Sequence, residues 1–184
     1  MLHFALRRSC CVYLRLAEAC GCNDQTKDKS GVSWQVTAEE LVLGSGGSVM
    51  RIAGMYNLRK NRNSFFLKGG NITRRADAFI GLVAYDDVVE AAIKMVDAPA
   101  AKTKGQVFIV ADGHEQTVES CFANGHPVLR FLGEDPLPFT FTGVEPTRGV
   151  LYDNSKLREV LGWQPTYASF QEYCQLILQG AIQP

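Results

Sequence analysis

Short hydrophobic runs of strand length alternate with stretches of helical periodicity through most of this 184-residue chain. The runs have the composition of buried strands, and the longer stretches have the spacing of amphipathic helices. The expected strands cover 48–53, 78–84 and 106–111, and the expected helices cover 38–43, 86–97, 155–161 and about 169–179. Such alternation is typical of an α/β fold with a parallel sheet, although three strands are few for a complete one.

Local signals predict where the first helices begin and which faces they bury. Thr37 is expected to cap helix 38–43, and Asp86 and Asp87 to cap helix 86–97, because short polar side chains accept hydrogen bonds from a helix's first N–H groups. The second helix is expected to bury one apolar face. That face comprises Val88, Val89, Ala92, Ile93 and Val96.

Later segments carry their own start and stop signals. Thr117 can cap a short helix that reaches Asn124-Gly125, and the proline-rich segment 134–146 is expected to be a loop. Residues 55–77, rich in Asn, Arg and Lys, are expected to form a long surface excursion, and excursions of that length are usually functional.

Composition excludes several classes of protein. Nineteen Lys and Arg balance nineteen Asp and Glu, so the chain lacks the clustered positive charge of nucleic-acid-binding proteins. The longest apolar runs are far below the roughly 18 residues of a membrane span. We therefore expect one ordinary globular domain with no nucleic acid and no membrane among its partners.

The first 35 residues differ from the rest. Residues 1–16 contain three arginines and no acid before Glu18, a weak likeness to an organellar transit peptide. Their cysteines include a C-x-C but no two C-x-x-C pairs, so we expect free thiols in a reducing compartment, cytoplasmic or organellar, and no metal. Residues 1–35 are expected to be poorly ordered, and the protein is not expected to be secreted. The cysteines are Cys10, Cys11, Cys20 and Cys22.

A glycine-rich segment, Gly44-Ser45-Gly46-Gly47, has two interpretations. Glycines allow a backbone to approach a pyrophosphate, but that motif needs the order strand, turn, helix and a third glycine where Val49 stands. Here a helix precedes and a strand follows, which favours a simple helix-to-strand turn over a phosphate cradle.

Four pieces of sequence, in order, together resemble a known family. They are Ala38-Glu39-Glu40-Leu41, the M-R-I-A-G-M-Y of 50–56, the I-G-L-V-A-Y-D-D-V-V of 80–89, and the N-S-K-L-R-E-V-L-G-W of 154–163. The chain resembles, over 36–178, the carboxy-terminal half of NAD(P)-dependent epimerase/dehydratase proteins, the extended short-chain dehydrogenase/reductase group. The resemblance implies a partial Rossmann-like NAD(P)-binding fold with carboxy-terminal substrate-domain segments. It also implies a missing amino-terminal nucleotide-binding half and a tail at 179–184.

The resemblance further implies where ligands would bind. Ala53, Gly54, Met55 and Tyr56 correspond to the strand end that passes the nicotinamide of NAD or NADP, and a plain strand-to-loop corner is the alternative. Arg62, Phe65 and Tyr85 are the implied contacts for a small-molecule or nucleotide-sugar substrate. A solvated cationic loop explains Arg62 at least as well, and core packing is the preferred explanation for Phe65.

The same comparison places no catalytic residue in this chain. The family's catalytic tyrosine and its lysine, four residues later on one helix, correspond to Gly31 and Gln35. Tyr56 and Lys60 have the Y-x-x-x-K spacing, but they follow a strand into an asparagine-rich loop, whereas the pair needs a helix face.

Other polar residues carry weaker signals. The family's substrate-contacting Asn and His correspond to Gly81 and Ala84, while its aspartate is kept as Asp87. Cys121 and His126 lie five residues apart, but no third group orients them as a nucleophile and base.

Two functions of different class follow. The first is an epimerase/dehydratase-like protein acting on a sugar nucleotide or related hydroxyl compound, catalytically incomplete as given and with weak NAD(P) binding. The second is a non-catalytic binding protein that keeps the second half of the fold and docks a partner at an exposed sheet edge.

Overall fold

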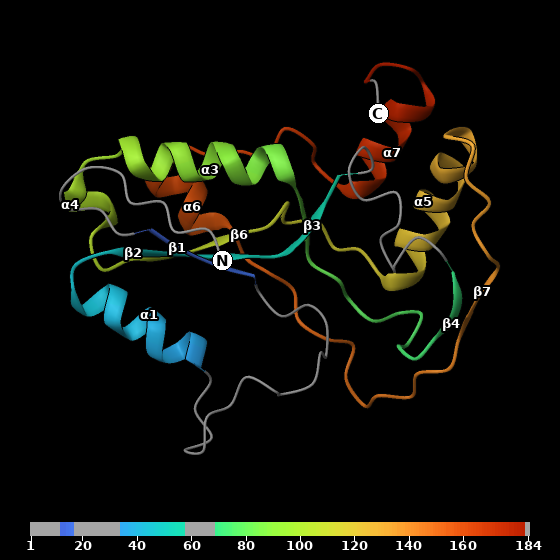
Figure 1. The fold of residues 1–184 in the computed structure, drawn as a ribbon, viewed down its shortest axis with the longest axis horizontal. Coiled ribbons are helices and arrows are strands. Elements are labelled where there is room, and N and C mark those ends of the chain that lie inside the picture. The colour runs from blue at the N-terminus through green and yellow to red at the C-terminus, as the bar shows by residue number, and fades with distance from the viewer. Residues whose placement is uncertain (1–11, 17–33, 58–68, 183–184) are drawn as a thin grey trace.

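The computed structural model describes residues 12–16, 34–57 and 69–182 (Figure 1). The strands are β1 (Val12–Leu16), β2 (Ser48–Ile52), β3 (Gly54–Tyr56), β4 (Gly70–Ile72), β5 (Leu82–Ala84), β6 (Val107–Val110) and β7 (Phe139–Phe141). The helices are α1 (Trp34–Gly44), α3 (Tyr85–Asp97), α4 (Ala100–Thr103), α5 (Val118–Phe131), α6 (Ser155–Leu161) and α7 (Phe170–Leu178). The α/β class expected from the sequence is confirmed.

The largest sheet is parallel and has the order β1-β2-β6. Figure 1 shows α1 on one side of this sheet and α3 and α6 on the other. Both faces are therefore covered, which is why β2 is buried at every residue except Arg51. Arg51 points toward α1, where its guanidinium forms an ion pair with the buried carboxylate of Glu39 at 2.6 Å.

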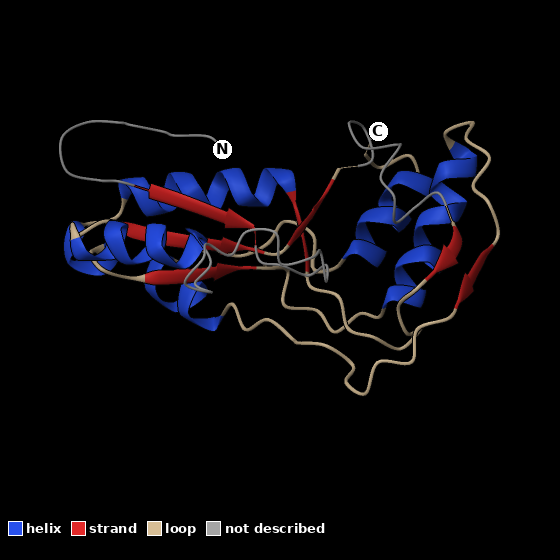
Figure 2. Cartoon of the chain, turned by 60° about the horizontal axis from the view of Figure 1, so that its bottom comes forward, coloured by secondary structure: helices blue, strands red, loops and turns tan. Residues whose placement is uncertain are grey.

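Two further parallel pairs lie outside this sheet. β3 continues the chain directly after β2 and pairs with β5, while β4 pairs with β7, about seventy residues further along the chain. In Figure 2 the sheet and its helices occupy one end of the molecule, and a second group of helices with the β4–β7 pair occupies the other. The β3–β5 pair joins the two ends.

Each end has its own hydrophobic core. The core at the sheet contains the largest buried side chains of β2, β6, α3 and α6, with Trp163 completely buried among them. The second core lies between α5 and α7 and includes Phe122, Leu129 and Ile177. Tyr56 on β3 belongs to this second core, whereas Ile52, four residues earlier, belongs to the first.

The expected apolar face of α3 is wrong. Val88 is buried as expected, but the other buried apolar residues are Ala91 and Met95, whereas Val89 and Ile93 are exposed. Two apolar stripes run along this helix, and the sheet covers the one that contains Met95. The periodicity alone could not tell which stripe would face the sheet.

The ends of several elements also differ from expectation. Helix α1 begins at Trp34, so Thr37 lies inside it rather than capping it. Only Leu82–Ala84 of the expected strand 78–84 is paired as a strand, because residues 79 and 80 bond singly to neighbouring loops. The expected loop 134–146 contains β7.

Helix α5 is longer than its sequence predicted. Thr117 caps it, in a reciprocal arrangement with Ser120, but the helix then passes through Gly125 and Pro127 to Phe131. Ring packing explains the extension. The His126 ring lies 5.6 Å from Phe122 and 5.1 Å from Phe139 of β7, and this tertiary contact outweighs the local helix breakers.

Within the described residues, no helix has the length and the apolar run that crossing a bilayer requires. The amino-terminal cysteines, and with them the expected disorder of most of residues 1–35, lie outside the described residues.

Candidate functional site

The β3–β5 pairing brings together the site residues that the structure describes. Gly54 pairs with Leu82 and Tyr56 with Ala84, so Tyr85, the first residue of α3, follows immediately beside the end of β3. Gly54, Met55 and Tyr85 are partly exposed, whereas Ala53 and Tyr56 are buried. Arg62 and Phe65 lie outside the described residues.

Two glycines allow the segments around these strands to approach closely. A Cβ at Gly54 would lie 2.9 Å from Leu82 Cδ2, and one at Gly81 would lie 2.0 Å from Tyr152 Cδ2. Only glycine fits at Gly81 without moving the Tyr152 ring. Segments 53–56, 79–84 and 148–152 therefore lie side by side, and the last of these was not singled out in the sequence.

Tyr56 is placed for packing. Its ring lies 5.0 Å from both Phe170 and Tyr173 of α7, and its hydroxyl has no hydrogen-bond partner among the described residues. Burial, followed by the charges of Asp112 and Asp87, raises the pKa of the phenol well above its usual value. A buried hydroxyl packed against α7 is not in a position to act as a general acid or base on a ligand at the surface.

The alternative catalytic pair gains no support from the backbone. Tyr56 is the last residue of β3, as the family resemblance implied, although the composition of 55–77 predicted a surface excursion there. Lys60 lies outside the described residues. Of the two positions that correspond to the family's catalytic pair, Gln35 lies in the first turn of α1, and Gly31 lies outside the described residues.

The glycine-rich segment is a turn between a helix and a strand. Helix α1 ends at Gly44 and β2 begins at Ser48, with Gly46 at a φ of 81° between them. A Cβ at Gly46 would lie 2.8 Å from the Lys104 side chain. A pyrophosphate cradle needs a following helix, so the described residues do not fit the phosphates of a dinucleotide here.

The carboxylate of Asp87 does not cap α3, which corrects the expectation. The helix starts after Ala84 without any side-chain cap. Asp87 is fully buried, and its Oδ1 accepts a hydrogen bond of 2.7 Å from the backbone N–H of Thr166. Its carbonyl accepts a bond of 3.1 Å from the indole N–H of Trp163. Asp87 thus ties the start of α3 to the segment after α6.

Cys121 and His126 are core residues. Both are buried on α5, and burial raises the pKa of the Cys121 thiol, so the reactive thiolate is disfavoured. The thiol of Cys174, on α7, is also buried, and its pKa is raised to about 12 for the same reason. Neither cysteine forms a disulfide.

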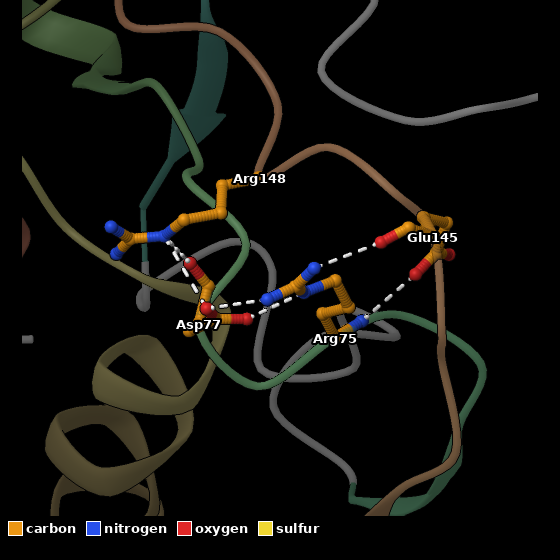
Figure 3. A network of polar contacts seen from close by, with 4 residues as sticks. All are labelled: Arg75, Asp77, Glu145 and Arg148. Carbon is orange, nitrogen blue, oxygen red and sulfur yellow. Dashed lines mark hydrogen bonds and ion pairs between the residues drawn. The ribbon is translucent and has the colours of Figure 1, made fainter.

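A polar network that the sequence did not indicate lies beside segment 79–84. Arg75 donates to both carboxylate oxygens of Asp77, at 2.7 and 2.8 Å, and to the carbonyl of Glu145 at 3.0 Å (Figure 3). The Arg75 guanidinium holds the pKa of Asp77 below its usual value. Arg148 Nε donates to the Asp77 carbonyl at 3.0 Å. The network fastens the loop before β5 to the segment after β7.

Arg148 has unused hydrogen-bonding capacity. Its guanidinium carbon lies 4.2 Å from the centre of the Phe79 ring, a cation–π contact that orients the group. Only Nε bonds within the described residues, and Figure 3 shows the two terminal nitrogens on the side away from Asp77. Arg148 is exposed. Two parallel N–H donors in this arrangement match a carboxylate or phosphate.

Comparison with solved structures identifies the fold. A UDP-glucose 4-epimerase from Thermotoga maritima, solved with UDP-glucose, matches with a TM-score of 0.66 and 18% identity over 93% of this chain and 62% of its own. The RMD protein from Pseudomonas aeruginosa, complexed with NADPH, matches with a TM-score of 0.64 and 15% identity over 92% of this chain and 65% of its own. A dTDP-glucose 4,6-dehydratase from Bacillus anthracis, in complex with NAD, matches with a TM-score of 0.60 and 13% identity over 91% of this chain and 61% of its own.

The chain therefore has part of the Rossmann-type fold of the epimerases and dehydratases, and it spans between 61% and 65% of the length of these three proteins. The expected resemblance and partial fold are confirmed. No family model matches the sequence, and no curated protein sequence matches it either.

Proposed function

We propose that this chain is an epimerase/dehydratase-like protein that binds a nucleotide sugar or a related anionic hydroxyl compound and does not turn it over. The observation that carries the proposal is Arg148, whose two terminal nitrogens are unused within the described residues and exposed beside segment 79–84. In the same segment group, Gly54, Met55 and Tyr85 supply a partly exposed, largely apolar surface. An anionic group held by Arg148 and an apolar or sugar portion over these residues fit that surface.

The proposed lack of turnover rests on Tyr56 and on the aligned positions Gly31 and Gln35. The ring of Tyr56 packs against α7, and its buried hydroxyl has no hydrogen-bond partner among the described residues. Tyr152 also has a lysine at the Y-x-x-x-K spacing, Lys156, but Tyr152 precedes α6 rather than lying on it, and Lys156 donates to the Val107 carbonyl. Loss of general acid–base catalysis lowers a rate by roughly 10²–10⁴-fold. NAD or NADP binding is expected to be weak and confined to the nicotinamide end, at Gly54 and Met55, because the turn at 44–47 does not fit a pyrophosphate.

Affinity measurements on matched variants test the binding proposal. UDP-glucose titrated into the wild type by calorimetry should bind, and Arg148→Ala should weaken binding by about tenfold to a hundredfold, the range for a charge-assisted hydrogen bond. Arg130→Ala, which removes an exposed arginine on α5, should bind like the wild type.

Asp77→Asn separates binding from the polar network. It weakens the contacts of Asp77 with Arg75 and Arg148 and leaves the Arg148 donors in place, so affinity should not fall. Equal affinity of the Arg148→Ala variant and the wild type would refute the role of Arg148. Saturable turnover of UDP-glucose with NAD would refute the lack of catalysis.

A second candidate, an interaction protein, is favoured by one observation. β1 is an outer strand of its sheet, and no described strand pairs with its other edge. Such an edge offers unpaired N–H and C=O groups to another chain. In this case the protein would associate with another chain and would not bind UDP-glucose. Leu14→Pro removes a backbone N–H from β1 and should abolish this association, measured by sedimentation. Two buried free thiols fit a reducing compartment, cytoplasmic or organellar, under either function.

A further inference from the structure

Three oxygen-bearing side chains are buried on elements that line the two hydrophobic cores, and we call this group the seam. They are Tyr56 at the end of β3, Asp87 in the first turn of α3, and Asp112 two residues after β6. The charges of two of them, Asp112 and Asp87, act on the third, Tyr56. Their exposed fractions are 7%, 0% and 7%. Tyr56 Oη, Asp87 Oδ2 and Asp112 Oδ2 have no hydrogen-bond partner among the described residues.

The remaining contacts of the seam join the two cores. The backbone N–H of Asp112 donates to the Leu82 carbonyl at 2.8 Å, linking the end of β6 to β5. Asp112 Oδ1 accepts from the backbone N–H of His114 at 3.0 Å, and Asp87 Oδ1 accepts from Thr166 at 2.7 Å. Each carboxylate thus has one hydrogen-bonded oxygen and one unsatisfied oxygen.

No cation balances the seam in the described part of the chain. The groups that interact with Asp112 and Tyr56 from neighbouring elements are Asp87 on α3, Cys121 on α5, and Tyr173 and Cys174 on α7, all acidic or neutral. Asn154, the neutral amide just before α6, uses its side-chain N–H on the Ala111 carbonyl at 2.7 Å.

Two charged carboxylates are costly to bury together without a cation. The two carboxylates differ in their placement, because Asp87 lies in the first turn of a 13-residue helix, where the helix dipole favours negative charge. Asp112 follows a strand and has no such support.

We propose that Asp112 is a neutral carboxylic acid in the folded protein and that its ionisation makes the seam a pH-sensitive joint between the two cores. When Asp112 loses its proton, a second negative charge appears beside Asp87 and Tyr56. The seam then admits water, and the contacts between β6, β5 and the segment after α6 weaken.

The direction of the effect with pH follows from linkage. Burial, with a smaller contribution from Asp87, raises the pKa of Asp112 from 3.8 to about 7. Because the folded pKa lies above the unfolded one, the stability that neutral Asp112 contributes is fully present below pH 3.8 and is lost as pH rises through about 7. The charge therefore enters the folded protein near neutral pH.

A carbon-13 titration of the Asp112 carboxyl in the wild-type protein tests the first half of the proposal and needs no variant. The expected midpoint is near pH 7, and a midpoint near pH 4 would overturn the proposal. With Asp87→Asn the midpoint should move to lower pH, because a neighbouring negative charge is removed while Thr166 keeps an acceptor.

Amide hydrogen exchange at pH 6 and pH 8 tests the joint. In the wild type, the protection factors of Asp112 and Thr166 should be at least threefold lower at pH 8 than at pH 6. The protection factor of Met50, within β2, should be the same at both pH values. Asp112→Asn mimics the neutral acid and should abolish the fall. The control Asp86→Asn, which changes an exposed carboxylate on the same helix as Asp87, should behave as the wild type. A fall that persists in Asp112→Asn would contradict the proposal.

Discussion

At the scale of single residues, Tyr56 shows how spacing and environment give different answers. Its distance from Lys60 matches a catalytic pair, but the side chain lies between Phe170 and Tyr173 with its hydroxyl unsatisfied. The family resemblance placed Tyr56 at a strand end, and it is the last residue of β3, whereas the composition of 55–77 predicted a loop. The sequence could not indicate the partners from α7, because they lie more than one hundred residues away along the chain.

Replacing Tyr56 with Phe tests this placement. The change removes a buried hydroxyl without a hydrogen bond and keeps the ring contacts. The free energy of unfolding should therefore stay the same or rise by about 1 kcal/mol. Urea unfolding followed by Trp fluorescence provides the measurement. A fall of more than about 1 kcal/mol in the free energy of unfolding would show that the hydroxyl has a hydrogen-bond partner.

Arg148 was missed for a similar reason. It stands in a loop without periodicity, and its partner Asp77 lies 71 residues earlier. Asp87 was noticed, but its contact with Thr166, 79 residues later, could not be inferred from a helix start. The sequence thus indicates candidate residues on strands and in family motifs, and it does not indicate residues whose contacts come from distant loops.

At the scale of elements, α3 separates what periodicity can and cannot predict. Its existence and limits followed from the apolar spacing and from Pro99, whereas the buried stripe is decided by the sheet beneath it. The β4–β7 pair was not predicted because both strands are only three residues long and pair across a long gap. The two main strands, β2 and β6, were predicted because each is a short, mostly apolar run of strand length.

Alanine substitutions on α3 distinguish the two stripes. Met95→Ala should lower the free energy of unfolding by about 2–5 kcal/mol, because Met95 is completely buried against the sheet. Ile93→Ala should change it by about 0.5 kcal/mol or less, since that side chain is 55% exposed. Thermal unfolding of both variants gives the comparison, and the reverse order of effects would mean that the other stripe is buried.

At the scale of the whole molecule, two cores meet at β3 and β5, and the candidate ligand surface lies beside that junction. The segments 53–56, 79–84 and 148–152 reach it from three distant parts of the chain. The β3–β5 pairing and the close contact of Gly81 with Tyr152 create this arrangement, while the described residues supply no dinucleotide phosphate cradle at the glycine-rich turn. We therefore expect ligand binding at the junction without catalysis.

The most direct test of binding without catalysis is a map of amide chemical shifts as UDP-glucose is added to nitrogen-15-labelled protein. We expect the largest changes at Gly54, Met55, Tyr85 and Arg148, with no conversion of the sugar when NAD is also present. Changes confined to residues 114–126, at the start of α5 and the loop before it, would contradict it.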